Sequence, residues 1–351
     1  MSDLLFMPRS KWTTGLDEVA VSSRIRLARN LSDRCFSHLM NDQQAQSLLN
    51  EGEEAVKELS RKTGQPYSFY RLSDLTAVQR GVLLEKHLIS PLLLEQRIST
   101  AVAIRHDEAV SIMFNEEDHL RIQCFLPGEQ LVESWSLADQ VDDCLGEVLS
   151  YAFDEKLGYL TTCPTNLGSG LRASVMLHLP ALVMTQKAAE VFDNMARLGL
   201  VVRGVYGEKT QGLGDLFQLS NQITLGKKEI EIINYLQSVA EQMIEKEKQS
   251  RRILQQQSAM ELYDSVWRAY GILTNARSIS TCEMMEKISL LRLGSCMGII
   301  NNIDAPKLNE LMLSCQPNFI GQKCQKELSP VQRDWERADL IRKTLKKIKE
   351  E

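Results

Sequence analysis

The pattern of the chain changes near Gly226. Before this residue, short apolar or β-branched runs alternate with stretches of helical periodicity. After it, residues 228–257 contain no proline or glycine and predict one long helix, and helical patterns continue to the C-terminus. The sequence therefore predicts an α+β fold, with a mixed domain over residues 1–226 and an all-helical domain over residues 227–351.

Local patterns predict individual elements within this division. Runs of apolar or β-branched residues predict strands at 100–104, 109–114, 120–125, 200–205 and 216–224. Helical spacing of apolar residues predicts helices at 134–152 and 180–198. The terminal helix is expected to begin after Ser329 as its N-cap, with Pro330 in its first position.

Composition excludes several classes of protein but indicates no function. Lys plus Arg is 41 and Asp plus Glu is 46, and the formal charge of −5 gives no reason to expect nucleic acid as a partner. No apolar run reaches the 18–20 residues or so of a membrane span, and the start lacks a secretory h-region. The eight cysteines form no CxxC pair, so reduced thiols in the cytoplasm are expected rather than disulfides or a zinc ribbon.

Four polar clusters are candidates for chemistry. In SSRIR, Arg24 and Arg26 would face the same side of a strand and can grip a polyphosphate, although a solvated basic face would look the same. Residues 115–121, NEEDHLR, place three carboxylates after an apolar strand, which suits contact with a cation or guanidinium, or an acidic turn in water.

The other two clusters are rich in small residues. CPTNLGSGLRAS, at 163–174, permits a close backbone approach to a ligand and offers Arg172 to a phosphate; it is not a Walker A motif. Cys163 is either a reactive thiolate or a buried structural thiol. Residues 203–212 form a charged, glycine-rich segment that is either a loop closing over a substrate or a mobile hairpin.

Together the four clusters resemble the guanidino (phosphagen) kinases, in the order and spacing of that family, across roughly residues 19–230. The resemblance implies a catalytic domain built as an antiparallel sheet flanked by helices. It also implies transfer of the γ-phosphoryl group of ATP, with Mg²⁺, onto a guanidinium nitrogen. No metal ligands are expected from protein side chains.

The position of the helical domain narrows the resemblance. Creatine and arginine kinases carry a helical domain before the catalytic one, whereas here SSRIR begins at Ser22 and helices follow. An RDxxRA segment lies at residues 333–338. Both features are similar to the bacterial protein arginine kinases, in which the acceptor is an arginine side chain of a protein. By this resemblance an allosteric phosphoarginine pocket contains Arg333, Asp334 and Arg337.

The resemblance also implies roles for individual residues. Glu117 is expected to hold the acceptor guanidinium and act as base, Glu208 to be its partner carboxylate, and Cys163 to lie beside the guanidinium as a thiolate. The expected nucleotide-binding residues are Ser22, Ser23, Arg24, Ile25, Arg26, His87, Arg121, Arg172, Ala173, Ser174, Val175, Met176, Arg203, Gly204, Val205, Tyr206, Gly207 and Glu208.

One departure and two alternatives remain. Metabolic arginine kinases have a second glutamate where this chain has Gln211, and an arginine where it has Tyr206. Either Glu208 takes the role of second carboxylate or Glu117 works largely alone. The alternatives to a protein kinase are a kinase of free arginine or another guanidino metabolite, and a phosphoarginine-binding adaptor with little catalysis.

The resemblance finally implies partners. They are protein substrates with exposed arginines, a zinc-binding activator protein, a stress-gene repressor and a Clp ATPase of a degradation pathway. We expect a homodimer in the cytoplasm, with no membrane and no direct nucleic-acid contact.

Overall fold

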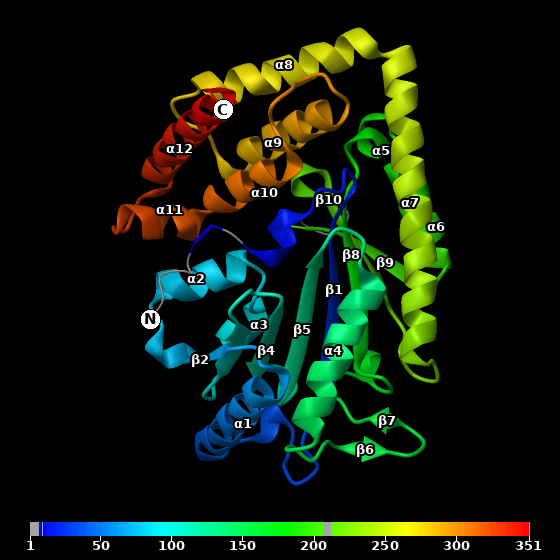
Figure 1. Ribbon diagram of the computed structural model, residues 1–351, viewed down its shortest axis with the longest axis vertical. Helices are drawn as coiled ribbons and strands as arrows, with labels where there is room; N and C mark the ends of the chain where they lie inside the picture. Colours follow the sequence, from blue (N-terminus) through cyan, green and yellow to red (C-terminus); the bar gives the residue numbers. More distant parts are fainter. Residues whose placement is uncertain (1–6, 9, 206–211, 351) are drawn as a thin grey trace.

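An eight-stranded sheet forms the centre of the molecule (Figure 1). The computed structural model describes residues 7–8, 10–205 and 212–350. The strand order is β2-β3-β4-β5-β1-β8-β10-β9, and every neighbouring pair is antiparallel. The strands are β1 (Ala20–Arg29), β2 (Tyr67–Arg71), β3 (Ala101–Arg105), β4 (Val110–Phe114), β5 (Leu120–Pro127), β8 (Leu171–His178), β9 (Leu200–Gly204) and β10 (Leu216–Asn221). The predicted antiparallel sheet is confirmed.

Helices surround the sheet and make up the rest of the chain. They are α1 (Asp42–Thr63), α2 (Ala77–Glu85), α3 (Pro91–Glu95), α4 (Leu131–Gly146), α5 (Pro180–Met184), α6 (Ala188–Arg197), α7 (Glu229–Gln257), α8 (Ala259–Asn275), α9 (Thr281–Cys296), α10 (Ala305–Ser314), α11 (Pro317–Cys324) and α12 (Pro330–Glu350). Figure 1 shows α8 to α12 gathered at one end of the sheet, with the long α7 running alongside it. Within the described ranges, no helix is long and apolar enough to cross a membrane.

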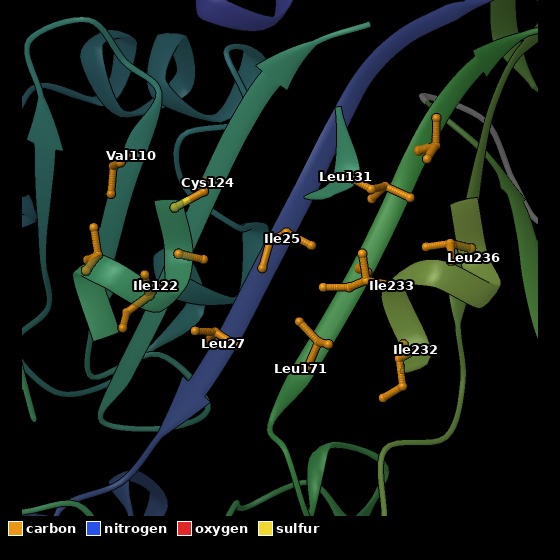
Figure 2. Packing of buried hydrophobic residues seen from close by; sticks show 14 of the residues in the cluster. Ile25, Leu27, Val110, Ile122, Cys124, Leu131, Leu171, Ile232, Ile233 and Leu236 are labelled. Atoms are coloured by element: carbon orange, nitrogen blue, oxygen red, sulfur yellow. The ribbon is translucent and has the colours of Figure 1, made fainter. Parts of the chain in front are cut away.

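Strand alternation gives the sheet one apolar face. Ile25, Leu27 and Ile122 are fully buried against helices α1, α4 and α7 in one hydrophobic cluster. Figure 2 shows Leu131 of α4 and Ile233 of α7 lying over the strands that carry these side chains. Because successive side chains of a strand point to opposite faces, the intervening residues of β1 are presented to the other face.

A second hydrophobic cluster joins the other side of the molecule. It combines sheet residues such as Phe125 and Met176 with side chains of α8 to α12, so the helical region packs directly on the sheet. Helix α7 contributes Leu236 to the first cluster and Leu254 to the second. The division of the chain at residues 226/227 therefore stays a prediction, because one helix takes part in both clusters.

Two predicted helices have wrong bounds. The helix expected at 180–198 is two helices: Thr185 bonds back to the carbonyl of Ala181 at 2.7 Å, and Gln186 has a φ of 59°, which ends α5. The helix expected at 134–152 begins and ends earlier, as α4, and the chain then returns to β1, where the amide of Ala152 donates to the carbonyl of Asn30 at 2.7 Å. Such returns depend on distant segments that local periodicity does not contain.

Candidate functional site

Arginines from four strands share one face of the sheet. Arg26 of β1 lies directly opposite Arg172 of β8, and Arg121 of β5 lies opposite Ala28, two residues along from Arg26. Arg24 is on the same side of β1, as its spacing from Arg26 predicts. The register extends this face to Arg203 of β9, which is exposed and does not line the cleft described next.

Three of these arginines line a cleft between the sheet and the α2–α3 region. This arginine cleft has a volume of about 680 Å³, and Arg24, Arg26, Arg121 and His87 are in its wall. The volume lies in the range typical of small-ligand sites. A cavity of about 840 Å³ beside α1 and α2 contains none of the predicted site residues.

The cleft brings like charges together in a buried setting. Burial, with the charges of Arg121 and Arg172, lowers the pKa of Arg24 to about 9. Burial and the charges of Arg24, Arg121 and Arg172 lower the pKa of Arg26. Among the described residues, the Nε atoms of Arg26 and Arg172 are buried donors without a hydrogen-bond partner. These unpaired donors and clustered positive charges suit a polyanionic ligand, which supplies both hydrogen-bond acceptors and negative charge.

His87 enters the same cleft in an uncharged form. Burial and the nearby charge of Arg24 lower the pKa of His87 to about 3. Its backbone has a φ of 60°, and its carbonyl accepts a hydrogen bond of 2.7 Å from Gln123 Nε2. The neutral imidazole is therefore suited to contact a ligand through its ring, and not to form an ion pair with it.

A second, smaller pocket adjoins the arginine cleft. This carboxylate pocket is lined by Glu117, Cys163 and Arg172, among others. It shares Arg26, Glu116 and Arg121 with the arginine cleft, so the two sites meet at these side chains. A polyanion in one site would reach a cation in the other.

Most of the NEEDH segment holds its own loop in place. Asp118 accepts hydrogen bonds from Asn30 Nδ2 at 2.6 Å and from the amide of Thr162 at 2.7 Å. His119 Nδ1 accepts from the amide of Leu31 at 3.0 Å. Asn115, with a φ of 59°, donates to the carbonyl of Ser99 at 2.8 Å. These buried groups anchor the loop to segments far away in sequence.

The two glutamates of NEEDH differ in their contacts. Glu116 is buried and accepts hydrogen bonds from Arg121 and from the hydroxyl of Ser90. Glu117 is half-buried, and the described residues offer its carboxylate no hydrogen bond or ion pair. Burial, Asp118 and Glu116 raise the pKa of Glu117 above its usual range. Glu117 is thus the carboxylate that faces the pocket and remains available to a cationic ligand.

Cys163 also lies in the wall of the carboxylate pocket, half-buried, with its Sγ 3.1 Å from Thr165 Oγ1. The glycines that follow it also make close contacts within the chain. A Cβ on Gly168 would lie 2.9 Å from Leu225 Cα, and one on Gly170 would lie 2.6 Å from the carbonyl of Ala28. The small residues permit the chain to approach its own backbone, and Gly170 also lines the carboxylate pocket, so the expected approach to a ligand stays a prediction.

Several predicted nucleotide-binding residues are not brought to the cleft by the structure. The side chains of Ile25, Ala173 and Val175 are fully buried in the hydrophobic cluster on the opposite face. Met176 belongs to the second cluster, and Ser23 donates to the carbonyl of Gly128 at 3.0 Å. The strand alternation that directs the arginines to the cleft directs the odd-numbered residues of β1 and β8 away from it, whereas Met176 is on the face of Arg172 and is buried in the second cluster.

The remaining expected nucleotide-binding residues either lie beside Arg24 on β1 and β8 or fall at or beyond the end of the described β9 segment. Ser174 lies under Arg24, whose Nε is 3.5 Å from its hydroxyl, and Ser22 is buried on the same strand face. Gly204 and Val205 end the described part of the β9 segment. The predictions for Tyr206, Gly207, Glu208 and Gln211 fall outside the described residues.

The RDxxRA residues lie together on α12. Arg337 is almost fully buried: its Nε donates to the carbonyl of Cys315 at 2.9 Å, and its Nη1 donates to the carbonyl of Ile279 at 2.8 Å and to Asp334 at 2.5 Å. Arg333 is half-buried. Arg337 thus joins three helical segments, and its role at a phosphoarginine stays a prediction.

Sequence reasoning missed several residues that line the arginine cleft. Polar residues among them include Glu85, Ser90, Gln123 and Gln316. Gln123 shares the face of Arg121 on β5 and was detectable by its spacing of two. The others come from α2, the turn before α3 and the turn before α11, and no local pattern marks them.

Two family models together cover most of the chain. Residues 48–250 match the ATP:guanido phosphotransferase C-terminal catalytic domain, and residues 259–351 match the protein-arginine kinase McsB C-terminal domain. The first match alone spans more than half of the chain. The chain belongs to the ATP:guanido phosphotransferase family.

Similar proteins agree with both matches. The chain is 49% identical to a protein-arginine kinase of Symbiobacterium thermophilum over 349 residues, 98% of this chain and 99% of the relative. It is 48% identical to that of Desulforamulus reducens, with 98% of each chain covered. It is 44% identical to that of Brevibacillus brevis, with 99% of each chain covered.

Solved structures support the fold. Lombricine kinase superposes with a TM-score of 0.58 at 23% identity, covering 69% of this chain and 70% of that one. The duplicated taurocyamine kinase from Schistosoma mansoni superposes with a TM-score of 0.59 at 23% identity, covering 81% of this chain and 40% of that one. Similarity at this level concerns the architecture and not the substrate.

Proposed function

We propose that this protein is an ATP-dependent protein arginine kinase. The observation that carries the proposal is the junction of the two sites, where Arg26, Arg121 and Glu116 belong both to the arginine cleft and to the carboxylate pocket. One site suits a polyphosphate and the other a cation, which is the pairing that phosphoryl transfer to a guanidinium requires. Relatives covering the whole chain are named protein-arginine kinases.

The arginine cleft is the proposed ATP site. Arg24, Arg26, Arg121 and Arg172 would hold the phosphates, whose oxygens satisfy the buried donors of Arg26 and Arg172. Mg²⁺, when bound to the nucleotide, would neutralise charge on the phosphates. We assign it no protein ligands, since the described residues contain no group of three His, Cys, Asp or Glu side chains placed to hold a metal.

The carboxylate pocket is the proposed acceptor site. Glu117 would accept hydrogen bonds from the arginine guanidinium and orient one nitrogen toward the γ-phosphorus. A bond forms between that nitrogen and phosphorus, and the bond between phosphorus and the bridging oxygen breaks, with its electron pair leaving on ADP. One proton passes from the attacking nitrogen to Glu117, and the product guanidinium keeps its positive charge.

Further residues belong to this proposal on family resemblance. Cys163, which lines the same pocket, would contact the guanidinium as a thiolate. Glu208 would supply a second carboxylate in place of the glutamate that Gln211 replaces. Arg333, Asp334 and Arg337 would form the phosphoarginine pocket.

The expected partners also remain part of the proposal. They are protein substrates with exposed arginines, a zinc-binding activator, a stress-gene repressor and a Clp ATPase, in the cytoplasm. We also propose a homodimer. Met260, Tyr263 and Trp267 of α8, with exposed fractions of 81%, 49% and 50%, form an apolar helix face that suits such a contact.

One experiment separates the proposed function from its alternatives. The protein is incubated with ATP and Mg²⁺ and with either free arginine or an arginine-rich protein, and acid-labile phosphate is measured in each. Label on the protein alone supports the proposed function. Label on free arginine indicates a metabolite kinase, and no label with retained phosphoarginine binding indicates an adaptor.

A further inference from the structure

A carboxylate in the arginine cleft forms the N-terminal cap of a helix in the C-terminal region. Glu85 is the last residue of α2 and lines the cleft. Its Oε1 accepts hydrogen bonds from the amide of Asn318 at 2.8 Å and from Asn318 Nδ2 at 2.7 Å, and its Oε2 accepts one from the amide of Phe319 at 3.1 Å. Asn318 and Phe319 belong to the first turn of α11.

These bonds satisfy donors that α11 cannot satisfy itself. The first amides of a helix have no partner within the helix. Pro317 has no N–H, and the side chain of Gln316 at the N-cap makes no capping hydrogen bond. The next two amides therefore depend on Glu85, whose negative charge also interacts favourably with the positive end of the helix dipole.

The contact is close and largely buried, so it leaves little freedom between the two helices. A Cβ on Gly81 of α2 would lie 2.3 Å from Asn318 Cγ, so the side chain of Asn318 occupies the space that the absence of a Cβ at Gly81 leaves free. Burial raises the pKa of Glu85 to about 7, and the hydrogen bonds from Asn318 and Phe319 oppose the rise. Figure 1 shows α11 lying beside α2.

Both sides of the contact lead into the same cleft. His87, two residues after Glu85, lies in the cleft wall. Gln316, two residues before Asn318, lines the cleft from the C-terminal region. The carbonyl of Cys315, the next residue back, is held by Arg337 of α12 at 2.9 Å. The position of α11 and the shape of the cleft are therefore fixed by one set of bonds.

We propose that Glu85 is a positioning residue, and that its cap on α11 couples the C-terminal helical region to the geometry of the ATP site. The proposal rests on the proposed function, because it takes the arginine cleft as the ATP site. It predicts that replacing Asn318 on α11, which does not line the cleft, weakens the cap and lowers the affinity for ATP.

The test uses the full-length protein and measures Mg-ATP affinity by calorimetry, together with kcat and KM. Asn318→Ala is expected to weaken ATP binding about threefold and Glu85→Ala about tenfold, on the scale of one and of several charge-assisted hydrogen bonds. Glu85→Gln, which keeps Oε1 but presents an NH₂ to Phe319, is expected to fall between wild type and Glu85→Ala. For Asn318→Ala the loss should appear in KM, with kcat nearly unchanged.

A matched control and a second readout complete the test. Asn275→Ala removes an asparagine whose bonds stay within α8 and its own neighbours, and it should leave ATP affinity unchanged. In a double-mutant cycle, Glu85→Ala and Asn318→Ala should be less than additive, because each removes part of the same contact. Hydrogen exchange of the Asn318 and Phe319 amides should accelerate in Glu85→Ala.

The outcomes are distinguishable. If wild type binds ATP but Asn318→Ala binds it equally well, or if the cycle is additive, Glu85 acts only as a wall of the cleft and the positioning role is wrong. If wild type itself binds no ATP, the proposed function fails and the coupling fails with it.

Discussion

Glu116 and Glu117 are adjacent in the chain but face different surroundings. Glu116 accepts hydrogen bonds from Arg121 and Ser90 and holds that arginine between the two sites, whereas the described residues leave the carboxylate of Glu117 open to the carboxylate pocket. Glu116 therefore fixes the position of Arg121, while Glu117 can accept hydrogen bonds from a ligand. The open carboxylate, Glu117, is the residue that we propose as the general base.

We expect Glu117→Gln to lower the rate of phosphoryl transfer by a factor of about 10²–10⁴, the usual contribution of a general base. ATP affinity should change little, because Glu117 is absent from the wall of the arginine cleft. Single-turnover rates and calorimetric ATP titration measure the two effects separately. Glu155→Gln, at an exposed position between β6 (Phe153–Asp154) and β7 (Gly158–Tyr159), is the matched control. Transfer at the wild-type rate by Glu117→Gln would exclude the assigned role.

The raised pKa of Glu117 predicts a pH dependence. The carboxylate must be ionised to accept the guanidinium and its proton, so activity should fall as the pH drops through the pKa, at a higher pH than for an ordinary glutamate. Asp118 contributes to this rise. Asp118→Asn can keep the two hydrogen bonds that Oδ1 accepts while removing the charge.

The acidic limb of kcat/KM against pH should therefore move to lower pH in Asp118→Asn. The fold of the variant is checked by its thermal unfolding. A limb that stays in place, or moves upward, would show that a group other than Glu117 controls it.

Part of the site was predictable because it depends on local geometry. The spacing of Arg24 and Arg26 places both on one strand face, and the structure brings both to the cleft. Which NEEDH residues anchor the loop and which face the pocket was not predictable. Asp118 and His119 form hydrogen bonds with Asn30, Leu31 and Thr162, which are all distant in sequence. Single-sequence patterns contain no information about such contacts.

The same limit applies to the fold. The long α7 was predictable from its uninterrupted helix-forming residues, and the terminal helix from Ser329, whose hydroxyl accepts from the amide of Gln332 at 3.3 Å. The break between α5 and α6 was not, because Gln186 adopts a left-handed conformation that no glycine or proline marks. Family resemblance, rather than local pattern, indicated the antiparallel sheet.

We expect Arg26→Lys to weaken ATP binding by about tenfold or more, because a lysine cannot reproduce the bidentate contacts of a guanidinium. Calorimetric titration with Mg-ATP measures this loss. Arg61→Lys, on the exposed side of α1, makes the same replacement away from the cleft and should have no effect. Equal affinity in the two variants would mean that the phosphates lie elsewhere.

Arg337 and Arg333 should differ in their effect on stability. Arg337→Ala leaves two buried carbonyls and Asp334 without their donor, and we expect a loss of about 3 kcal/mol in the free energy of unfolding. Arg333→Ala, at a half-buried position, should change it by no more than about 0.5 kcal/mol. Urea denaturation of both variants checks this, and similar losses in the two would contradict it.

Arg333→Ala is consequently the cleaner probe of the proposed phosphoarginine pocket. Because its fold should be intact, weaker binding of phosphoarginine by this variant can be assigned to the pocket. We expect a loss of about tenfold in affinity, as for an arginine–phosphate contact. Unchanged affinity would remove Arg333 from the pocket.

The central claim is that the junction of the two sites transfers phosphate to arginine side chains of proteins. The most direct measurement is mass spectrometry of an arginine-rich protein after incubation with ATP and Mg²⁺, under conditions that preserve acid-labile phosphate. We predict phosphate on arginine with the wild-type protein and none with Glu117→Gln. Phosphate on serine, threonine or tyrosine, or equal arginine phosphorylation by both proteins, would contradict the claim.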